Sequence, residues 1–201
     1  MDEARQVRDF WFGKLPLTAQ ALGQRLDLWF PGEERAEVTR NWDDAIRTRF
    51  GTLVERAALG ELASWADSPR RCLSLILLLD QFPRNIYRGT ARAFASDDQA
   101  LAVTLSGMES AADAALDVVE RLFFYMPLHH SEVREIQDES VTGYRRLLAE
   151  APEELGSAFE GVLKYAEQHR TVIERFGRFP SRNRALHRVS TPEEAAWLRG
   201  G

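Results

Sequence analysis

Apolar residues recur along the chain at intervals of three and four positions, which places them on one face of an α-helix. The clearest set keeps a strict four-residue spacing: Val38, Trp42, Ile46 and Phe50. No run of alternating apolar and polar residues is long enough to predict a strand with the same clarity. The pattern therefore predicts an all-α protein without a significant β-sheet.

Glycine, proline and capping residues divide this pattern into about nine helices. The predicted helices span residues 2–12, 33–50, 53–65, 69–81, 96–106, 115–125, 131–148, 152–176 and 191–198. The segment before residue 33 is interpreted as a connection. The helix at 69–81 is apolar on nearly all sides, so we expect it to be central and to stop near Phe82, because Pro83 follows. Short links favour antiparallel neighbours, hence helix pairs or a bundle.

The composition is that of one globular domain covering residues 1–201, with 44% hydrophobic and 28% charged residues. Cys72 is the only cysteine, which excludes an intrachain disulfide and favours a reducing compartment. The N-terminus lacks the features of a signal peptide, and no apolar stretch approaches the roughly 20 residues that cross a bilayer. We therefore expect a cytoplasmic location and no membrane partner.

Charge changes this picture in one respect. The net charge of −5 argues against nucleic acid as a partner, because nucleic-acid binding needs a basic face. Arginine is nevertheless concentrated in two segments that contain no acid, residues 82–92 and 175–188. Guanidinium groups bind carboxylates and phosphates through two parallel hydrogen bonds. This distribution favours a small anionic ligand over a polymer.

Each arginine-rich segment contains a phenylalanine–proline pair followed by arginine and asparagine. The candidate ligand contacts in these segments are Arg84, Asn85, Arg88, Arg178, Arg182 and Asn183. The alternative is structural, because arginine near a helix C-terminus also complements unpaired carbonyls and the helix dipole. Asp80 ends an apolar helix, where an unpaired carboxylate would be costly, so we expect it to pair with one of these arginines.

A third segment, residues 120–132, places two adjacent histidines after a proline and adds Arg121 to the candidate ligand contacts. A metal site formed by His130, Glu132 and His169 is an alternative, but no histidine pair has the i, i+4 spacing of helical metal sites. The chain also lacks a glycine-rich phosphate loop and a cofactor fingerprint. We therefore expect neither a metal nor a cofactor.

The candidate proton donors or acceptors are His130 and His169, since histidine titrates closest to neutral pH. Asp80 is the candidate carboxylate that would orient one of them. A lone histidine on a helix is also commonly a hydrogen-bonded structural residue. A pair of adjacent residues such as Ser131 and His130 rarely has the geometry for nucleophilic catalysis. The sequence leaves open whether the chain is an enzyme.

Taken together, these motifs resemble the DUF924 family, bacterial proteins of unknown function with a tetratricopeptide-like helical fold. The resemblance covers nearly the whole chain and rests on ordered motifs at residues 9–13, 78–89 (LLDQFPRNIYRG), 120–132, 174–183 and 190–194. It implies a stacked, right-handed array of helix pairs. It implies no particular reaction.

We expect the arginine-rich segments and the histidines to converge in one pocket that binds a small anionic metabolite. The alternative function is a tetratricopeptide-like module that binds a segment of a protein partner in a concave groove. In the structural alternative, the motifs only secure the ends of helices. The deciding observation is whether Arg84, Arg121, His130, His169 and Arg182 line one cavity.

Overall fold

The computed structural model describes residues 2–200, and this part of the chain contains helices and no strand. The α-helices are α1 (Glu3–Phe12), α2 (Ala19–Trp29), α3 (Ala36–Ala58), α4 (Pro69–Ile76), α5 (Phe82–Ile86), α6 (Asp97–Glu109), α7 (Val118–Phe124), α8 (Met126–His130), α9 (Arg134–Glu150), α10 (Gly156–Phe176) and α11 (Pro192–Gly200). A π-helical segment, Leu77–Gln81, joins α4 to α5. The predicted all-α class is confirmed.

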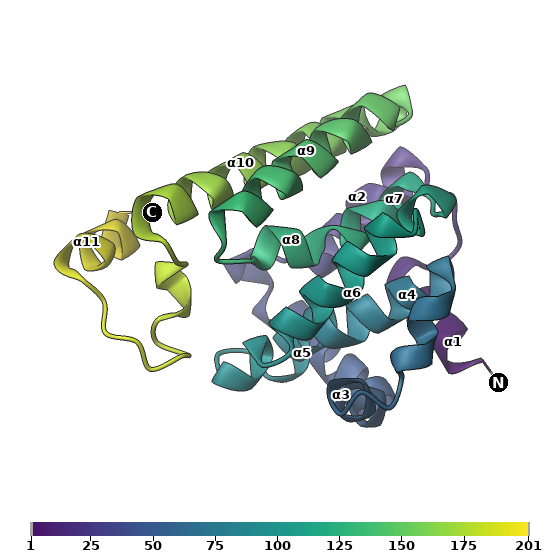
Figure 1. Cartoon of the computed structure of the whole chain (residues 1–201), viewed down its shortest axis with the longest axis horizontal. Helices are drawn as coiled ribbons and strands as arrows, with labels where there is room; N and C mark the ends of the chain where they lie inside the picture. The colour runs from purple at the N-terminus through teal and green to yellow at the C-terminus, as the bar shows by residue number, and fades with distance from the viewer. Residues whose placement is uncertain (1, 201) are drawn as a thin grey trace.

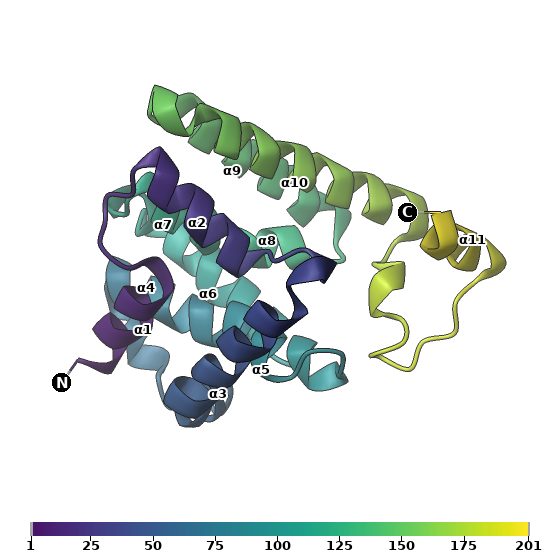
Figure 2. The ribbon, with the colours of Figure 1, turned by 180° about the vertical axis from the view of Figure 1, so that it is seen from behind.

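The helices are arranged around a central rod, residues 69–86, made of α4, the π-helical segment and α5. The rod contacts α1, α6 and α7 through α4 and contacts α3 through α5. Figures 1 and 2 show α9 and α10 as a long antiparallel pair across one side of the molecule, with α2 on the opposite face from α6. Helix α11 lies beyond the C-terminal end of α10, at the end of the molecule away from the N-terminus (Figure 1).

The core is rich in aromatic side chains that come from helices far apart in the sequence. Trp11 on α1 is 1% exposed and packs against Trp29, Phe82 and Phe123, with ring centroids 5.3–5.9 Å apart. The indole N–H of Trp29 donates to the Trp11 carbonyl at 3.3 Å. Buried aromatic pairs of this kind contribute beyond the area they bury. They fix α1 and α2 against the rod and α7.

Two elements differ from the predictions near the N-terminus. Residues 19–29 were interpreted as part of a connection but form α2, which the side chain of Thr18 caps by accepting from the Ala21 N–H. The predicted helix end at Gly51 is wrong, because α3 continues to Ala58. Glycine inside a helix costs only about 1 kcal/mol. The buried face formed by Leu53, Val54 and Ala57 outweighs that cost.

The prolines also end fewer helices than expected. The predicted stop near Phe82 is wrong, since the rod widens into one π-helical turn and continues as α5, with Pro83 in its first turn. The Phe82 N–H accordingly donates to the Leu77 carbonyl, five residues back. Pro127 likewise lies in the first turn of α8. Proline has no N–H group to donate, and the first turn of a helix is the position where it is best tolerated. Both prolines therefore stand at the start of short helices that carry candidate site residues.

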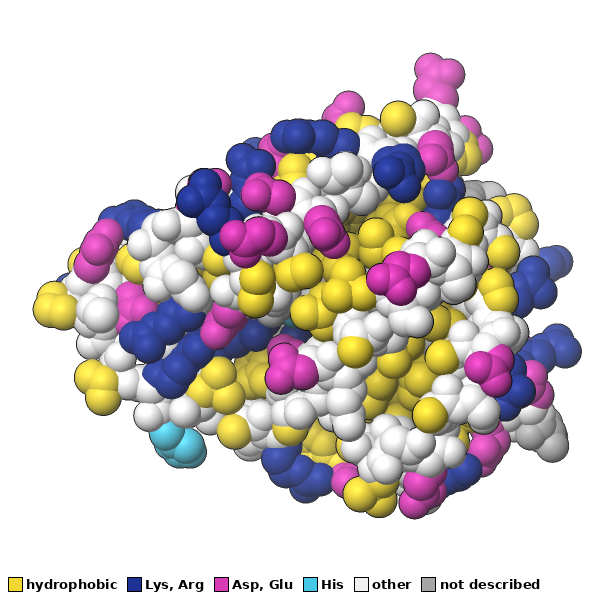
Figure 3. All heavy atoms as spheres, viewed as in Figure 1, with side chains coloured by type: hydrophobic (Ala, Val, Ile, Leu, Met, Phe, Trp, Pro, Cys, Tyr) yellow, Lys and Arg dark blue, Asp and Glu magenta, His cyan; other side chains and the backbone are white. Residues whose placement is uncertain are grey.

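The surface is mixed in charge. Basic and acidic side chains are interspersed over α9 on the face drawn in Figure 3, and hydrophobic side chains are visible below them. Across residues 2–200, no helix combines the length and apolar composition needed to span a membrane.

Candidate functional site

Asp80 lies in the π-helical segment and is fully buried. Its Oδ1 atom lies 2.7 Å from Nδ1 of His130 and 3.1 Å from Nη1 of Arg84, and its Oδ2 atom accepts from the Gln81 side chain at 2.6 Å. Burial alone would raise the pKa of this carboxyl. The Arg84 guanidinium and His130 outweigh burial and hold the pKa of Asp80 well below its usual value. The expected pairing of Asp80 with an arginine is confirmed.

The ion pair extends to a second aspartate and a second arginine. Arg84 binds both oxygens of Asp97 at 2.9 Å, and Arg182 reaches Asp97 at 3.3 Å. Burial raises the pKa of Asp97, although both arginines oppose this. Arg182 also donates to the carbonyl oxygen of His130 at 2.9 Å. One network of alternating charge therefore joins both arginine-rich segments to α8.

Three histidines lie next to this network. The ring centroids of His129 and His169 are 3.9 Å apart, and those of His129 and His130 are 5.6 Å apart. Burial lowers the pKa of all three, to about 4 for His130 and for His169. Nearby arginines lower the pKa further, Arg84 for His130 and Arg182 for His169. The histidines are therefore neutral at physiological pH.

The hydrogen-bond partners assign the tautomers of two of these rings. Nδ1 of His130 faces the carboxylate of Asp80, and Nδ1 of His169 faces the carbonyl of Tyr165 at 3.1 Å. Both partners only accept, so each neutral ring donates from Nδ1 and carries its lone pair on Nε2. His129 is 3% exposed, and its Nδ1 atom has no hydrogen-bond partner among the described residues. The cluster thus supplies acceptor nitrogens and one buried nitrogen with unused capacity.

A cavity of about 630 Å³, hereafter the central cavity, opens beside this cluster. Figure 2 shows α2, α8 and α10, three of the helices whose residues line it. Its lining residues are Leu26, Trp29, Phe30, Gln81, Arg84, Asn85, Arg88, Met126, His129, His130, Tyr144, Ser157, Ala158, Gly161, Val162, Tyr165 and His169. The predicted site residues among them are Arg84, Asn85, Arg88, His130 and His169. Asp80 and Arg182 lie behind this lining and hold it through the hydrogen bonds given above.

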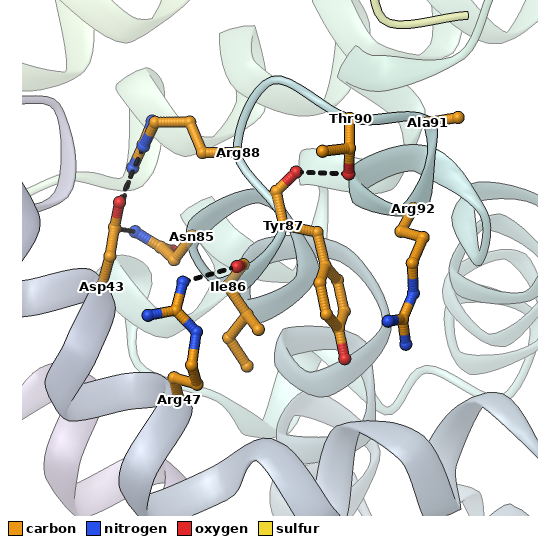
Figure 4. Close-up of a pocket in the computed structure, with 9 residues that line it drawn as sticks. All are labelled: Asp43, Arg47, Asn85, Ile86, Tyr87, Arg88, Thr90, Ala91 and Arg92. Carbon is orange, nitrogen blue, oxygen red and sulfur yellow. Dashed lines mark hydrogen bonds and ion pairs between the residues drawn. The ribbon is translucent and has the colours of Figure 1, made fainter.

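A shallower pocket of about 520 Å³ adjoins the central cavity and shares Asn85 and Arg88 with it (Figure 4). Both side chains point toward Asp43 of α3, which accepts from Asn85 at 2.8 Å and from Arg88 at 2.8 and 2.9 Å. Arg47 donates to the Ile86 carbonyl at 2.8 Å on the same side. Asp43 therefore fixes two of the predicted ligand contacts.

Three predicted ligand contacts lie elsewhere and do not line the central cavity. Arg121 pairs with Glu150 at 2.6 Å. Arg178 binds both oxygens of Glu194 at 2.6 and 2.8 Å, and Asn183 donates to Glu194 at 3.2 Å. These side chains secure contacts between helices. The expected convergence therefore holds for Arg84, His130 and His169, with Arg182 directly behind them, and does not include Arg121.

The sequence also missed residues that complete the site. The candidate residues did not include Asp97, at the start of the predicted helix 96–106, or His129, although it is adjacent to His130. Nothing in the local pattern marked Asp43. Asp43 follows Trp42 on an amphipathic helix yet is 8% exposed, so its burial depends on tertiary packing. Glu132, a candidate ligand in the metal alternative, pairs with Arg188 at 2.7 Å instead. Among residues 2–200, no group of three or more His, Cys, Asp or Glu side chains is placed to hold a metal ion.

Comparison with known proteins identifies a family and a similar fold, and it indicates no reaction. The family described as "Bacterial protein of unknown function (DUF924)" matches residues 7–201. The solved structure of a protein of unknown function, ATU0120 from Agrobacterium tumefaciens, is 34% identical in sequence with a TM-score of 0.80. The match covers 98% of this chain and 97% of that one. No curated protein matches the chain. The chain belongs to the DUF924 family of bacterial proteins of unknown function.

Proposed function

We propose that this chain binds a small anionic metabolite in the central cavity. The observation that carries the proposal is the buried Nδ1 atom of His129, which has no partner among the described residues, in a side chain that belongs to the cavity lining. Nine buried side-chain polar atoms lack a partner among the described residues, and only this one belongs to a residue that lines the central cavity. A buried polar atom without a partner costs about 1–3 kcal/mol. A ligand atom that bonds to this nitrogen would recover part of that cost.

The electrostatics of the cluster support a negative ligand. Burial is the main cause that lowers the pKa of His129, and the neighbouring histidines and then Arg182 and Arg84 lower it further, although Asp80 and Asp97 lie in the same network. A proton on His129 is therefore disfavoured by the charges around it. The same positive potential would favour an anion placed against the ring.

Arg88 is the best-placed direct contact for such an anion. It binds Asp43 through Nε and Nη2, and its guanidinium carries more N–H donors than this one acid uses. Its side chain is 53% exposed, in contrast to the 18% of Arg84. Arg88 can therefore turn unused donors toward a ligand without breaking a buried ion pair.

The cluster also offers a proton acceptor. Asp80 holds His130 in the tautomer that leaves Nε2 unprotonated, and His130 lines the cavity. Such a carboxylate–imidazole pair is the arrangement that general base catalysis uses. The proposal is nevertheless for binding, because no nucleophile or second reactant is identified beside this nitrogen.

Thermal-shift measurements with phosphate, acetate and citrate at neutral pH test the proposal. A ligand at 100 times its Kd adds about 2.7 kcal/mol of stability, which in a chain of this size raises Tm by about 5–10 °C. Arg88→Gln should remove this shift. The matched control is Arg145→Gln, which changes a half-exposed arginine paired with Glu167 on the outer helix pair and should keep the shift.

Two results would overturn the proposal. One is that none of the anions raises Tm at millimolar concentration. The other is that Arg88→Gln responds to them as fully as the unchanged protein does. Saturable binding of an extended peptide without any response to anions would favour the protein-interaction alternative instead.

A further inference from the structure

The lining of the central cavity is divided between polar and apolar elements. The polar side chains of the lining come from the central rod and from Arg88, which lies just after it. Those from the rod are Gln81, Arg84 and Asn85. Helix α2, the residue that caps its end, Phe30, and helix α10 contribute mainly apolar and aromatic ones, among them Trp29, Val162 and Tyr165. An inorganic anion would contact only the polar part. The apolar part therefore requires a separate explanation.

Two aromatic side chains of the lining are open to solvent. Phe30 is 48% exposed and Tyr165 is 56% exposed, although both line the cavity. Large aromatic side chains gain stability from burial, so two exposed ones at the same concave site mark a place for a partner. The cavity volume of about 630 Å³ also lies in the range of sites that enclose organic ligands.

Helix α10 keeps this space open with small residues. Ser157, Ala158 and Gly161 all line the cavity. A Cβ atom added at Gly161 would meet nothing within 4 Å, so packing does not require glycine there. Glycine inside a helix is unfavourable relative to alanine. The missing side chain leaves room beside Val162 and Tyr165.

We propose that the ligand of this cavity is an amphipathic acid with a flat, ring-containing body. Its single anionic group lies at Arg88 and Asn85, next to His129, and its ring lies between the α2 and α10 sides, against Phe30 and Tyr165. The inference rests on the proposed function and adds the chemical class of the ligand. Aromatic rings favour offset or edge contacts with a planar body. The buried His129 nitrogen is a second observation, separate from the small residues on α10. It supplies a hydrogen-bonding position beside the head group.

Titration calorimetry with a probe series tests the class of ligand. The probes are acetate, phenylacetate and indole-3-acetate, with neutral phenethyl alcohol as the uncharged control. Each buried methylene equivalent increases affinity about fourfold. Indole-3-acetate should therefore bind more than about a hundredfold more tightly than acetate, and phenethyl alcohol should bind far more weakly than phenylacetate.

A pair of variants at one position tests the location. Gly161→Phe fills the space beside Tyr165 and should reduce the affinity for indole-3-acetate by at least tenfold, while phosphate binding and Tm stay close to those of the unchanged protein. Gly161→Ala is the matched control and should bind indole-3-acetate normally. Because the Cβ position is open, both variants should fold.

The outcomes separate the two proposals. If acetate or phosphate binds as tightly as indole-3-acetate, or if Gly161→Phe leaves ring binding unchanged, the amphipathic ligand is ruled out and anion binding stands. If phenethyl alcohol binds as tightly as phenylacetate, charge is irrelevant and the proposed anion site is ruled out with it.

Discussion

Single residues give this site its chemistry by being held in unusual protonation states. His129, His130 and His169 are kept neutral by burial and by the arginines around them, while Asp80 is kept ionised. The neutral rings of His130 and His169 can accept a hydrogen bond from a ligand through Nε2, because Nδ1 of each ring already donates within the protein. The cost of this arrangement appears when the pH is lowered.

The histidines predict a pH-dependent stability. In the unfolded chain they bind protons near pH 6.5, whereas His130 and His169 do so near pH 4 when folded. Between these values the unfolded state holds more protons, so the free energy of unfolding falls as the pH is lowered. The slope is at most about 1.4 kcal/mol per pH unit for each histidine. Above about pH 5 the loss from Asp80 does not yet contribute, because its carboxyl titrates lower in both states.

Urea unfolding between pH 7 and pH 5 measures this slope. His169→Gln should reduce the slope by about one proton. His187→Gln, which changes an exposed histidine outside the cluster, is the matched control. An equal slope in His169→Gln and the unchanged protein would contradict the assignment.

At the scale of elements, α10 combines two glycines with opposite roles. Gly161 lies inside the helix, whereas Gly177 ends it in the left-handed region at φ 66° and donates to the Ile173 carbonyl at 2.8 Å. Both Cβ positions are open, so packing does not distinguish the two sites. Only the backbone conformation does.

Alanine at these two positions should therefore act in opposite directions. Gly177→Ala should lower the free energy of unfolding by about 1–2 kcal/mol, because a side chain is disfavoured in the left-handed region. Gly161→Ala should raise it by about 0.4–1 kcal/mol, since alanine favours the helix and restricts the unfolded chain. Urea unfolding curves compare the two directly, and a shift of the same sign in both variants would refute this account.

The elements also show how far the sequence could be interpreted. Helices α9 and α10 were predicted nearly to their ends, because one face is apolar and the other polar. Helix α2 was missed, since the Pro31–Gly32 pair suggested a connection before residue 33. The stop at Pro83 was mispredicted because a π-helical turn depends on the packing of the rod, which no local pattern encodes. Tertiary context decided these boundaries.

The candidate site was predictable in the same uneven way. Asp80, Arg84 and His130 stand in motifs and do meet in space. Asp43 and Asp97 could not be assigned as partners, because the sequence does not reveal which acid reaches which arginine across tens of residues. Arg121 and Arg178 looked equivalent to Arg84 in sequence, yet they pair with Glu150 and Glu194 at other places in the fold.

At the scale of the whole molecule, residues 177–200 form a C-terminal unit set apart from the body (Figures 1 and 2). It is held to the body by Arg188 on Glu132 and by Arg182 on Asp97. Within the unit, Glu194 accepts from Arg178, Asn183 and the Thr191 N–H. The side chain of Arg178 holds the pKa of Glu194 down, to about 2.

Glu194→Gln should therefore loosen this unit without unfolding the body. Amide hydrogen exchange in residues 192–200 should become faster, because the neutral side chain loses the charge-assisted bonds to Arg178. Exchange in α4 and α9 should stay unchanged, and Glu193→Gln, which changes the exposed neighbour paired with Arg175, is the matched control. Uniformly faster exchange across the whole chain would show instead that the unit and the body unfold together.

The π-helical turn in the central rod has a consequence for how this family can vary. One extra residue in a helical turn rotates everything after it by about 100°. The rod can therefore point Leu73 and Ile76 into the core before the turn and still aim Asp80, in the turn, and Arg84 and Arg88, after it, at the site. A substitution in this segment changes the side chain at one position and leaves the direction of the others unchanged. A single deletion or insertion there would turn the whole row of polar side chains away from the histidines at once, so relatives that keep the site should keep the length of this segment.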